Sequence, residues 1–190
     1  MTRAPLFKRA FQWRANLVAL FGIVLLFLKW GEVESHWVFY VGAGLLFAGI
    51  AMRIVSQMYV HHRLEGPLDL TVSGPYAYVR NPLYIANTLM LCSLCFLSEL
   101  VWLAPVAIVW GAVVYSFAIR YEESHLREAI GAHYEEYMRN VPRWLPRRTP
   151  WQAPWESPRD MRASRYLMPS VFAELHCFLW PIPFILKEML

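Results

Sequence analysis

Apolar residues in this chain occur in long, nearly continuous runs, without the alternation of polar and apolar positions that marks a helix or strand at a water-exposed surface. Four such runs cover residues 16–28, 37–55, 82–97 and 100–119. A helix needs roughly 20 apolar residues to cross a bilayer, so the second and fourth runs are long enough and the other two are shorter. The pattern predicts an all-α protein, a polytopic membrane helical bundle of four to five transmembrane helices.

A further apolar segment, 166–190, contains three prolines and Glu174, and the pattern leaves open whether it spans the membrane, re-enters it or lies on its surface. Of the 190 residues, 57% are hydrophobic and only 17% charged, compared with roughly a quarter charged in soluble domains. No Ser/Gly-rich linker and no repeat divides the chain. We therefore expect one membrane domain over residues 1–190.

Positive charge is concentrated in three regions: before the first run, in the loop at 56–81, and from 120 to 165. Lys and Arg are retained on the cytoplasmic side of membrane proteins. With four spans, this distribution predicts a multi-pass integral membrane protein with a cytoplasmic N-terminus and both long polar segments on the same side. The joint between the third and fourth runs is so short that these two helices must form an antiparallel hairpin.

The polar segment before the third run holds the first candidate site, with the sequence Ser-Gly-Pro-Tyr-Ala-Tyr-Val-Arg-Asn-Pro-Leu-Tyr over 73–84. Pro82 suits the first position of a helix and Asn81 its N-cap. The free amides of a helix N-terminus and the neighbouring Arg80 can also bind an anionic carboxylate.

The second candidate site is Arg120-Tyr121-Glu122-Glu123, directly after the fourth run, where charged residues are expected at the membrane surface. An amphipathic stretch with Tyr134 and Tyr137 follows. A purely structural alternative stays open: Glu123 could pair with Arg127, and Glu135 with Arg139, at helical i, i+4 spacing.

Together the two segments resemble the membrane methyltransferase family that includes isoprenylcysteine carboxyl methyltransferase and the phospholipid N-methyltransferases. The resemblance covers about residues 74–146, and its motifs occur in the family's order around the helical hairpin. The matching residues are Gly74, Pro75, Tyr76, Arg80, Asn81, Pro82, Tyr84, Glu122, Glu123, Gly131, Tyr134, Tyr137, Val141, Pro142 and Arg143. One position departs from the family pattern, because Asn81 replaces a histidine and cannot shuttle a proton near neutral pH.

The resemblance implies S-adenosylmethionine as cofactor, bound on the cytoplasmic side, and an acceptor that enters from the lipid. The implied cofactor-binding residues are Tyr78, Arg80, Asn81, Pro82, Leu83, Tyr84, Glu122, Tyr134 and Tyr137. Arg120 and Glu123 are the implied catalytic residues. We expect Arg120 to clamp an acceptor carboxylate or phosphate and Glu123 to hold the cofactor's ammonium group or to position Arg120.

The expected partners are membrane lipids and a lipophilic or prenylated substrate, with a carboxylate acceptor favoured. Three alternatives remain open: a phospholipid amine N-methyltransferase, an NADPH-dependent reductase of the sterol-reductase type, and a non-catalytic membrane adaptor. No metal site is expected, because Cys92 and Cys95 lack a second ligand pair. The basic segment near the C-terminus fits anionic lipid better than nucleic acid.

Overall fold

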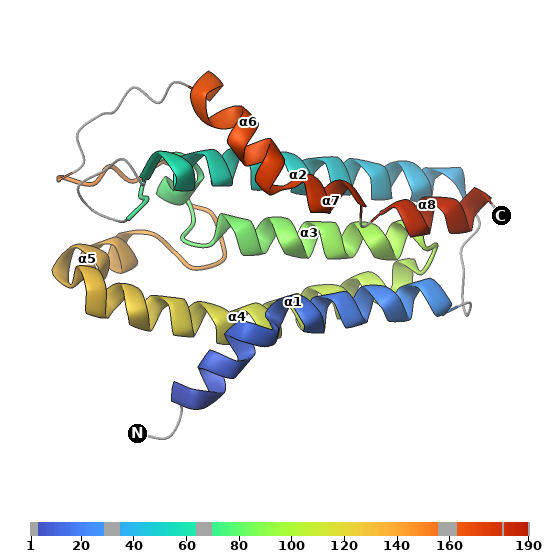
Figure 1. Cartoon of the computed structure of the whole chain (residues 1–190), viewed down its shortest axis with the longest axis horizontal. Helices are drawn as coiled ribbons and strands as arrows, with labels where there is room; N and C mark the ends of the chain where they lie inside the picture. The colour runs from blue at the N-terminus through green and yellow to red at the C-terminus, as the bar shows by residue number, and fades with distance from the viewer. Residues whose placement is uncertain (1–3, 29–34, 64–69, 156–162, 180, 190) are drawn as a thin grey trace.

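The computed structural model describes residues 4–28, 35–63, 70–155, 163–179 and 181–189. Four long helices run side by side in alternating directions: α1 (Ala4–Phe27), α2 (His36–Arg63), α3 (Pro82–Leu97) and α4 (Ala104–Ile130) (Figure 1). The most extensive packing is between α3 and α2, and α1 packs chiefly on α4. The prediction of an all-α bundle is confirmed.

Small residues allow α3 to approach its two neighbours closely, as expected where helices associate in an apolar environment. A Cβ on Gly49 of α2 would lie 2.6 Å from Cγ of Met90 and 3.1 Å from the carbonyl oxygen of Ala86. On the other side, a Cβ on Gly111 of α4 would lie 2.9 Å from Oγ1 of Thr88. Larger residues at these two glycines would push the helices apart.

A tight connection joins α3 to α4. Glu99 adopts a positive φ of 58°, and the amide of Leu100 donates to the carbonyl of Cys95 at 2.9 Å. A short 3-10 helix, η2 (Val101–Leu103), then leads into α4. The predicted antiparallel hairpin is therefore present, and it places the start of α3 near the end of α4.

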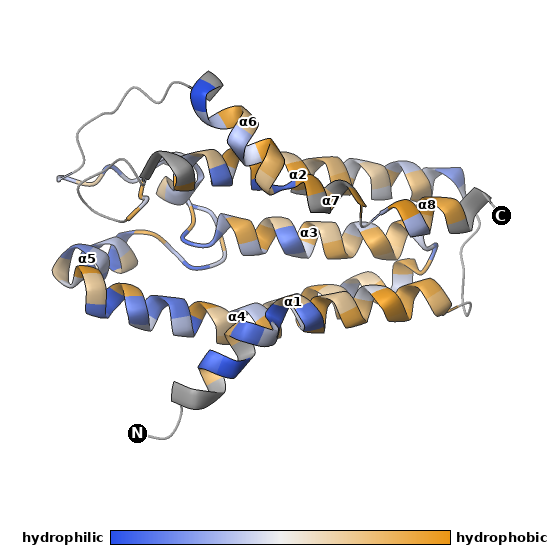
Figure 2. Cartoon of the chain, in the orientation of Figure 1, coloured by the Kyte–Doolittle hydropathy of each residue, from blue (hydrophilic) through white to orange (hydrophobic). Residues whose placement is uncertain are grey.

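The surface of the bundle is strongly apolar. Residues His36–Val60 and Val101–Ile130 form helices that are long and apolar enough to cross a membrane, and Phe11–Phe27 and Pro82–Leu97 are shorter apolar helices. Large hydrophobic side chains point outward, including Phe27, 81% exposed, and Phe47, 76% exposed. Figure 2 shows that hydrophilic residues gather at the end of the bundle where α5 lies. These features indicate an integral membrane protein.

The C-terminal segment forms three short helices, α6 (Ala163–Ala173), α7 (Leu175–Leu179) and α8 (Ile182–Met189). Helix α6 packs on α2, and α8 lies against α3 and α1 (Figure 1). Each is much shorter than the roughly 20 residues that a spanning helix needs. Trp180 and Leu190, which belong to the predicted segment, lie outside the described residues.

The polar end of the bundle is built from the 3-10 helix η1 (Gly74–Ala77), from α5 (Ala132–Asn140) and from residues 141–155. Helix α4 continues to Ile130, beyond the apolar run that ends at residue 119. Its last three turns therefore carry Glu122 and Glu123 alongside the start of α3. This arrangement brings the two polar segments of the sequence together.

Candidate active site

The loop that precedes α3 is held by backbone contacts to the chain after α5. The amide of Arg80 donates to the carbonyl of Pro142, that of Arg147 to Tyr78, and that of Trp151 to Ala77, each at 2.9 Å. These bonds cross from one polar segment to the other. They hold in place the backbone segment that carries Arg80 and Asn81.

Gly74 is required where this loop turns. Its φ is +58°, a conformation that residues with a Cβ rarely adopt. A Cβ at this position would also lie 2.3 Å from Cζ of Tyr59 in α2. The glycine of the Gly-Pro pair thus lets the loop lie directly against the ring of Tyr59.

Asn81 occupies the predicted N-cap position of α3, and Pro82 is the first helical residue. The Asn81 side chain makes no capping hydrogen bond; its Nδ2 donates to the carbonyl of Arg143 at 3.3 Å. The capping role predicted for this side chain is therefore wrong. Asn81 instead ties the start of α3 to the segment after α5.

Glu123 is the centre of a buried ion-pair network and is only 5% exposed. Its Oε1 lies 3.2 Å from Nη1 of Arg80. Arg143 donates to the same carboxylate through Nε at 3.1 Å and Nη2 at 2.5 Å. The carboxylate therefore joins α4 to both loops, and the alternative pairing of Glu123 with Arg127 is wrong.

The other predicted helical ion pair, Glu135 with Arg139, is present at 3.8 Å with both side chains exposed. An exposed pair of this kind contributes only about 0.3–0.5 kcal/mol. The Glu135–Arg139 pair is therefore a surface ion pair, whereas Glu123, in the same segment of the sequence, belongs to a buried polar site.

Glu122 lies beside this network and accepts a hydrogen bond from the hydroxyl of Tyr84 at 2.7 Å. The ring of Tyr84 also contacts that of Tyr115 in α4, with 4.7 Å between the ring centroids. Tyr84 therefore links the first turn of α3 to α4 through both its hydroxyl and its ring.

Two buried tyrosines of α5 form the outer wall of the site. Helix α4 ends at Ile130, and its C-cap residue Gly131, with a φ of +67°, redirects the chain into α5. The hydroxyl of Tyr137 donates to the carbonyl of Tyr76 at 2.8 Å. Burial and the negative charge of Glu123 raise the pKa of the Tyr134 phenol, so this group keeps its proton at neutral pH.

These elements line an open cavity of about 560 Å³, which we name the polar cavity. Binding sites for small molecules usually have volumes of about 300–1,000 Å³. The sequence-predicted residues that line it are Arg80, Asn81, Pro82, Leu83, Tyr84, Glu122, Glu123, Tyr134 and Tyr137. Arg120 and Tyr78 are exposed and do not belong to its lining.

The composition of the polar cavity fits a zwitterionic ligand with an aromatic part. Nε of Arg80 is buried and has no hydrogen-bond partner in the described part of the chain. A buried donor without a partner is unfavourable, and a ligand carboxylate would satisfy it. Glu122 and Glu123 are acceptors for an ammonium group. The rings of Phe11, Tyr121, Tyr134 and Tyr137 offer surfaces for a purine.

Comparison with known proteins identifies the family. The sequence profile described as phospholipid methyltransferase matches residues 18–133, more than half of the chain. This chain belongs to the phospholipid methyltransferase family. That family is related to the membrane methyltransferases of the isoprenylcysteine carboxyl methyltransferase type, so the resemblance seen in the sequence is confirmed.

Two curated proteins are similar to this family member over most of its length. The nickel-cobalt-cadmium resistance protein NccN of Alcaligenes xylosoxydans xylosoxydans is 26% identical over 136 residues, which cover 68% of this chain and 61% of that protein. The cobalt-zinc-cadmium resistance protein CzcN of Cupriavidus metallidurans is 28% identical over 132 residues, which cover 68% and 60%. The chain thus spans about three fifths of the length of these curated relatives. No solved structure shows a significant match to it.

In this phospholipid methyltransferase family member, the polar cavity is also lined by residues that the sequence motifs did not indicate. The most polar of them are Arg14, Arg53, Asn87 and His125. Arg53 could have been found from the sequence, because it lies inside a predicted span, where a charged residue is costly and is a default candidate for function. Asn87, inside the third predicted span, gave a weaker signal of the same kind, whereas Arg14 precedes the first predicted span and gave none.

Proposed function

We propose that this protein is an S-adenosylmethionine-dependent methyltransferase that acts on a lipophilic acceptor. The observation that carries the proposal is the polar cavity, in which Arg80 before α3 and Glu123 of α4 face each other at 3.2 Å. The family to which the chain belongs supports the same reaction class.

Three groups of residues in the polar cavity would each contact a different part of the cofactor. Arg80, with its unpartnered Nε, would hold the carboxylate of the methionine moiety. Glu122 and Glu123 would accept from its ammonium group. Tyr134 and Tyr137 would pack against the adenine, each fixed in place by burial.

When bound, the cofactor supplies an electrophilic methyl group on a positively charged sulfur. The acceptor would form a bond to that methyl carbon as the carbon–sulfur bond breaks, with the electron pair of that bond left on sulfur. For a carboxylate acceptor the products are a methyl ester and S-adenosylhomocysteine. The contribution of the chain is positioning, since near-attack geometry can remove roughly 7–11 kcal/mol of barrier in the best intramolecular cases.

A carboxylate acceptor is favoured because it is already a nucleophile and needs no general base. Asn81, which stands where the family has histidine, is consistent with such a reaction. We assign binding of the acceptor's anionic group to arginines that line the polar cavity, since Arg120 is exposed and lies outside its lining.

A phospholipid amine is the second candidate acceptor, because His125 lines the polar cavity. Its Nδ1 lies 3.0 Å from the carbonyl oxygen of Tyr121. A carbonyl only accepts, so Nδ1 carries the proton in the neutral ring and Nε2 is left as an acceptor. Nε2 could take the proton that an ammonium group must lose before it is methylated.

We also propose that the polar cavity opens on the cytoplasmic side. The support is the distribution of positive charge, since the loops at the polar end of the bundle are rich in arginine and the connections at the other end are not. Cysteine labelling from each side of sealed vesicles, with single cysteines introduced at Arg148 and at Trp102, would determine the orientation.

The experiment that tests the proposed function is a binding titration on the purified full chain in detergent. We expect binding of labelled S-adenosylmethionine, competition by S-adenosylhomocysteine and no competition by NADPH. Arg80→Ala should weaken this binding at least tenfold, because it removes a charge-assisted contact. Arg139→Ala, at an exposed position of α5, is the matched control and should bind normally.

Binding of NADPH without binding of S-adenosylmethionine would favour the reductase of the sterol-reductase type. Absence of binding of either cofactor to a folded wild-type chain would favour the adaptor. Once an acceptor is available, His125→Gln separates the two acceptor classes: methylation of an amine should fall sharply, whereas methylation of a carboxylate should not.

A further inference from the structure

A second cavity of about 370 Å³ lies beside the polar cavity, and we name it the apolar cavity. Its lining is mostly aliphatic, from α1, α2 and α3, and includes Val18, Leu46 and Leu94. Tyr115 of α4 and, from the C-terminal segment, Cys177 and Pro181 also line it. Three residues line both cavities, Arg14, Arg53 and Asn87. The two spaces therefore meet at a junction formed by two arginines and an asparagine.

Arg53 has its guanidinium group already engaged at this junction. Its Nε and Nη2 donate to the two carboxylate oxygens of Glu174 at 2.6 and 3.0 Å. Its Nη1 donates to Oδ1 of Asn87. The side chain is 16% exposed and that of Glu174 is 3% exposed. This buried two-point contact neutralises Arg53 and anchors the C-terminal segment to α2.

Arg14 is the other charge at the junction, and its contacts are different. Its Nη1 donates to the carbonyl of Phe11 at 2.5 Å, and its guanidinium lies 3.7 Å from the centre of the Phe11 ring. No carboxylate among the described residues forms an ion pair with it. Of the two arginines at the junction, Arg53 is therefore paired with Glu174, whereas Arg14 has no ion pair among the described residues. The positive charge of Arg14 lies between an apolar space and the polar cavity.

We propose that the apolar cavity is the acceptor site and that it takes a lipid with one anionic group, a carboxylate or a phosphate, bound at the junction by Arg14. The hydrocarbon chain of the lipid fills the aliphatic part of the cavity. The planar fork of an arginine matches both kinds of anion. This inference rests on the proposed function, and it specifies the acceptor for the same site.

Charge and continuity both support this occupant. A cation without an ion pair at the edge of an apolar space is stabilised by an anion that binds next to it. Because the shared residues Arg14 and Asn87 line both cavities, an anionic group at the junction lies at the edge of the space proposed for the cofactor. A neutral lipid would form no ion pair with Arg14.

The test uses the purified full chain in dodecyl maltoside, a non-ionic detergent, and three labelled probes: oleate, dioleoylphosphatidic acid and oleyl alcohol. Wild type should bind at least one anionic probe at least tenfold more tightly than oleyl alcohol. Comparing oleate with phosphatidic acid identifies which anion is preferred. Arg14→Gln should abolish the preference over the alcohol, and Arg14→Lys should retain part of it.

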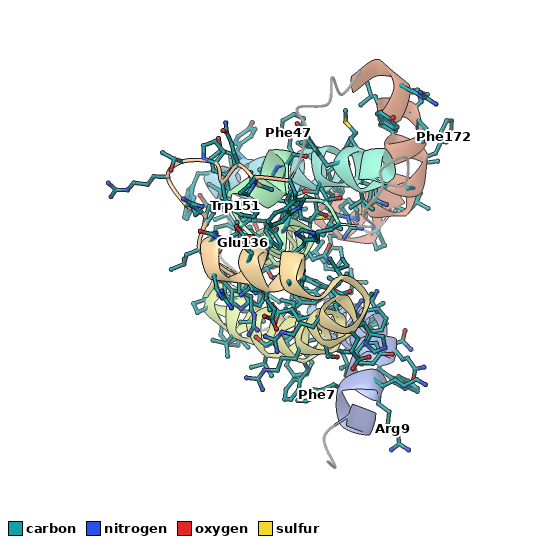
Figure 3. All side chains as sticks on the ribbon, turned by 90° about the vertical axis from the view of Figure 1, so that its left-hand side faces the viewer. Phe7, Arg9, Phe47, Glu136, Trp151 and Phe172 are labelled. Atoms are coloured by element: carbon teal, nitrogen blue, oxygen red, sulfur yellow. The ribbon has the colours of Figure 1, made fainter. Side chains whose placement is uncertain are left out.

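Two control variants test whether the lipid preference depends on Arg14 and on the apolar cavity. Arg9→Gln removes the same charge from the same helix at an exposed position, away from the other helices in Figure 3, and should bind like wild type. Ala15→Phe fills the apolar cavity and should weaken oleate and oleyl alcohol alike. Thermal unfolding in the same detergent verifies that each variant is folded.

Equal binding of all three probes by wild type would overturn the inference, as would an unchanged preference in folded Arg14→Gln. Binding of S-adenosylmethionine is measured separately on the same samples. If wild type binds the cofactor but shows no preference for anionic lipid, only the proposed acceptor site is refuted. If wild type prefers anionic lipid but binds no cofactor, the proposed enzymatic function is refuted.

Discussion

Replacing Glu123 with alanine tests the central contact of the polar cavity. The substitution removes a carboxylate that is 5% exposed and leaves Arg80 and Arg143 without their shared partner. Breaking a buried ion pair by removing one side typically costs about 3–5 kcal/mol, because the remaining charge stays in a medium of low dielectric.

The structure indicates which part of this range applies. The Arg143 side chain is 30% exposed and can turn toward water, whereas that of Arg80 is 12% exposed and cannot do so as easily. We therefore expect the free energy of unfolding to fall by about 3 kcal/mol, the lower end of the range. Affinity for S-adenosylmethionine should fall at least tenfold as well, since Arg80 loses the group that positions it.

Reversible unfolding in mixed micelles measures the first effect, and a titration with labelled S-adenosylmethionine measures the second. Glu135→Ala is the matched control, because its partner Arg139 lies at 3.8 Å and both side chains are exposed. That variant should lose no more than about 0.5 kcal/mol. If Glu123→Ala loses as little as the control and binds the cofactor like wild type, the assignment of Glu123 as the organiser of the site is refuted.

Two further substitutions test the framework of the site. Gly74→Ala forces a residue with a Cβ to adopt a φ of +58° against the Tyr59 ring. It should lower the free energy of unfolding by at least about 2 kcal/mol in the same assay. The control is Gly44→Ala, which has nothing within 4 Å of its added Cβ and should be neutral or stabilise α2. Tyr84→Phe removes the 2.7 Å hydrogen bond to Glu122 and should lower the free energy of unfolding by about 1.5–3 kcal/mol, and an unchanged value would show that this bond contributes nothing.

The bundle and the meeting of its two polar segments were predictable from the sequence because bilayer thickness restricts what an apolar run can form. The runs that became α2 and α4 have the length of a spanning helix. The short connection after Leu97 leaves α3 and α4 no arrangement other than a hairpin. The residues that precede α3 must then lie near those that end α4, which is where Arg80 and Glu123 meet.

Which neighbouring helices Arg14, Arg53 and Asn87 face was not predictable in the same way. In a water-soluble protein the apolar face of a helix identifies its buried side, but lipid is as apolar as a helix interface, so a membrane helix carries little such signal. The actual partners of Glu123 were also missed, because Arg80 and Arg143 are distant in sequence and only the tertiary fold brings them close. Local spacing favoured Arg127, which the structure leaves outside the network.

The backbone bonds that tie Ala77, Tyr78 and Arg80 to residues 142–151 have a consequence for biosynthesis. The ribosome finishes all four long apolar helices about twenty residues before it reaches Trp151, so membrane insertion can precede closure of the loop before α3. A nascent chain arrested just after α5 would contain the complete hairpin and Glu123 but would lack residues 142–151, whose backbone hydrogen bonds hold the loop that carries Arg80. Completion of the polar cavity is in this sense a late event of translation, separate from insertion into the bilayer.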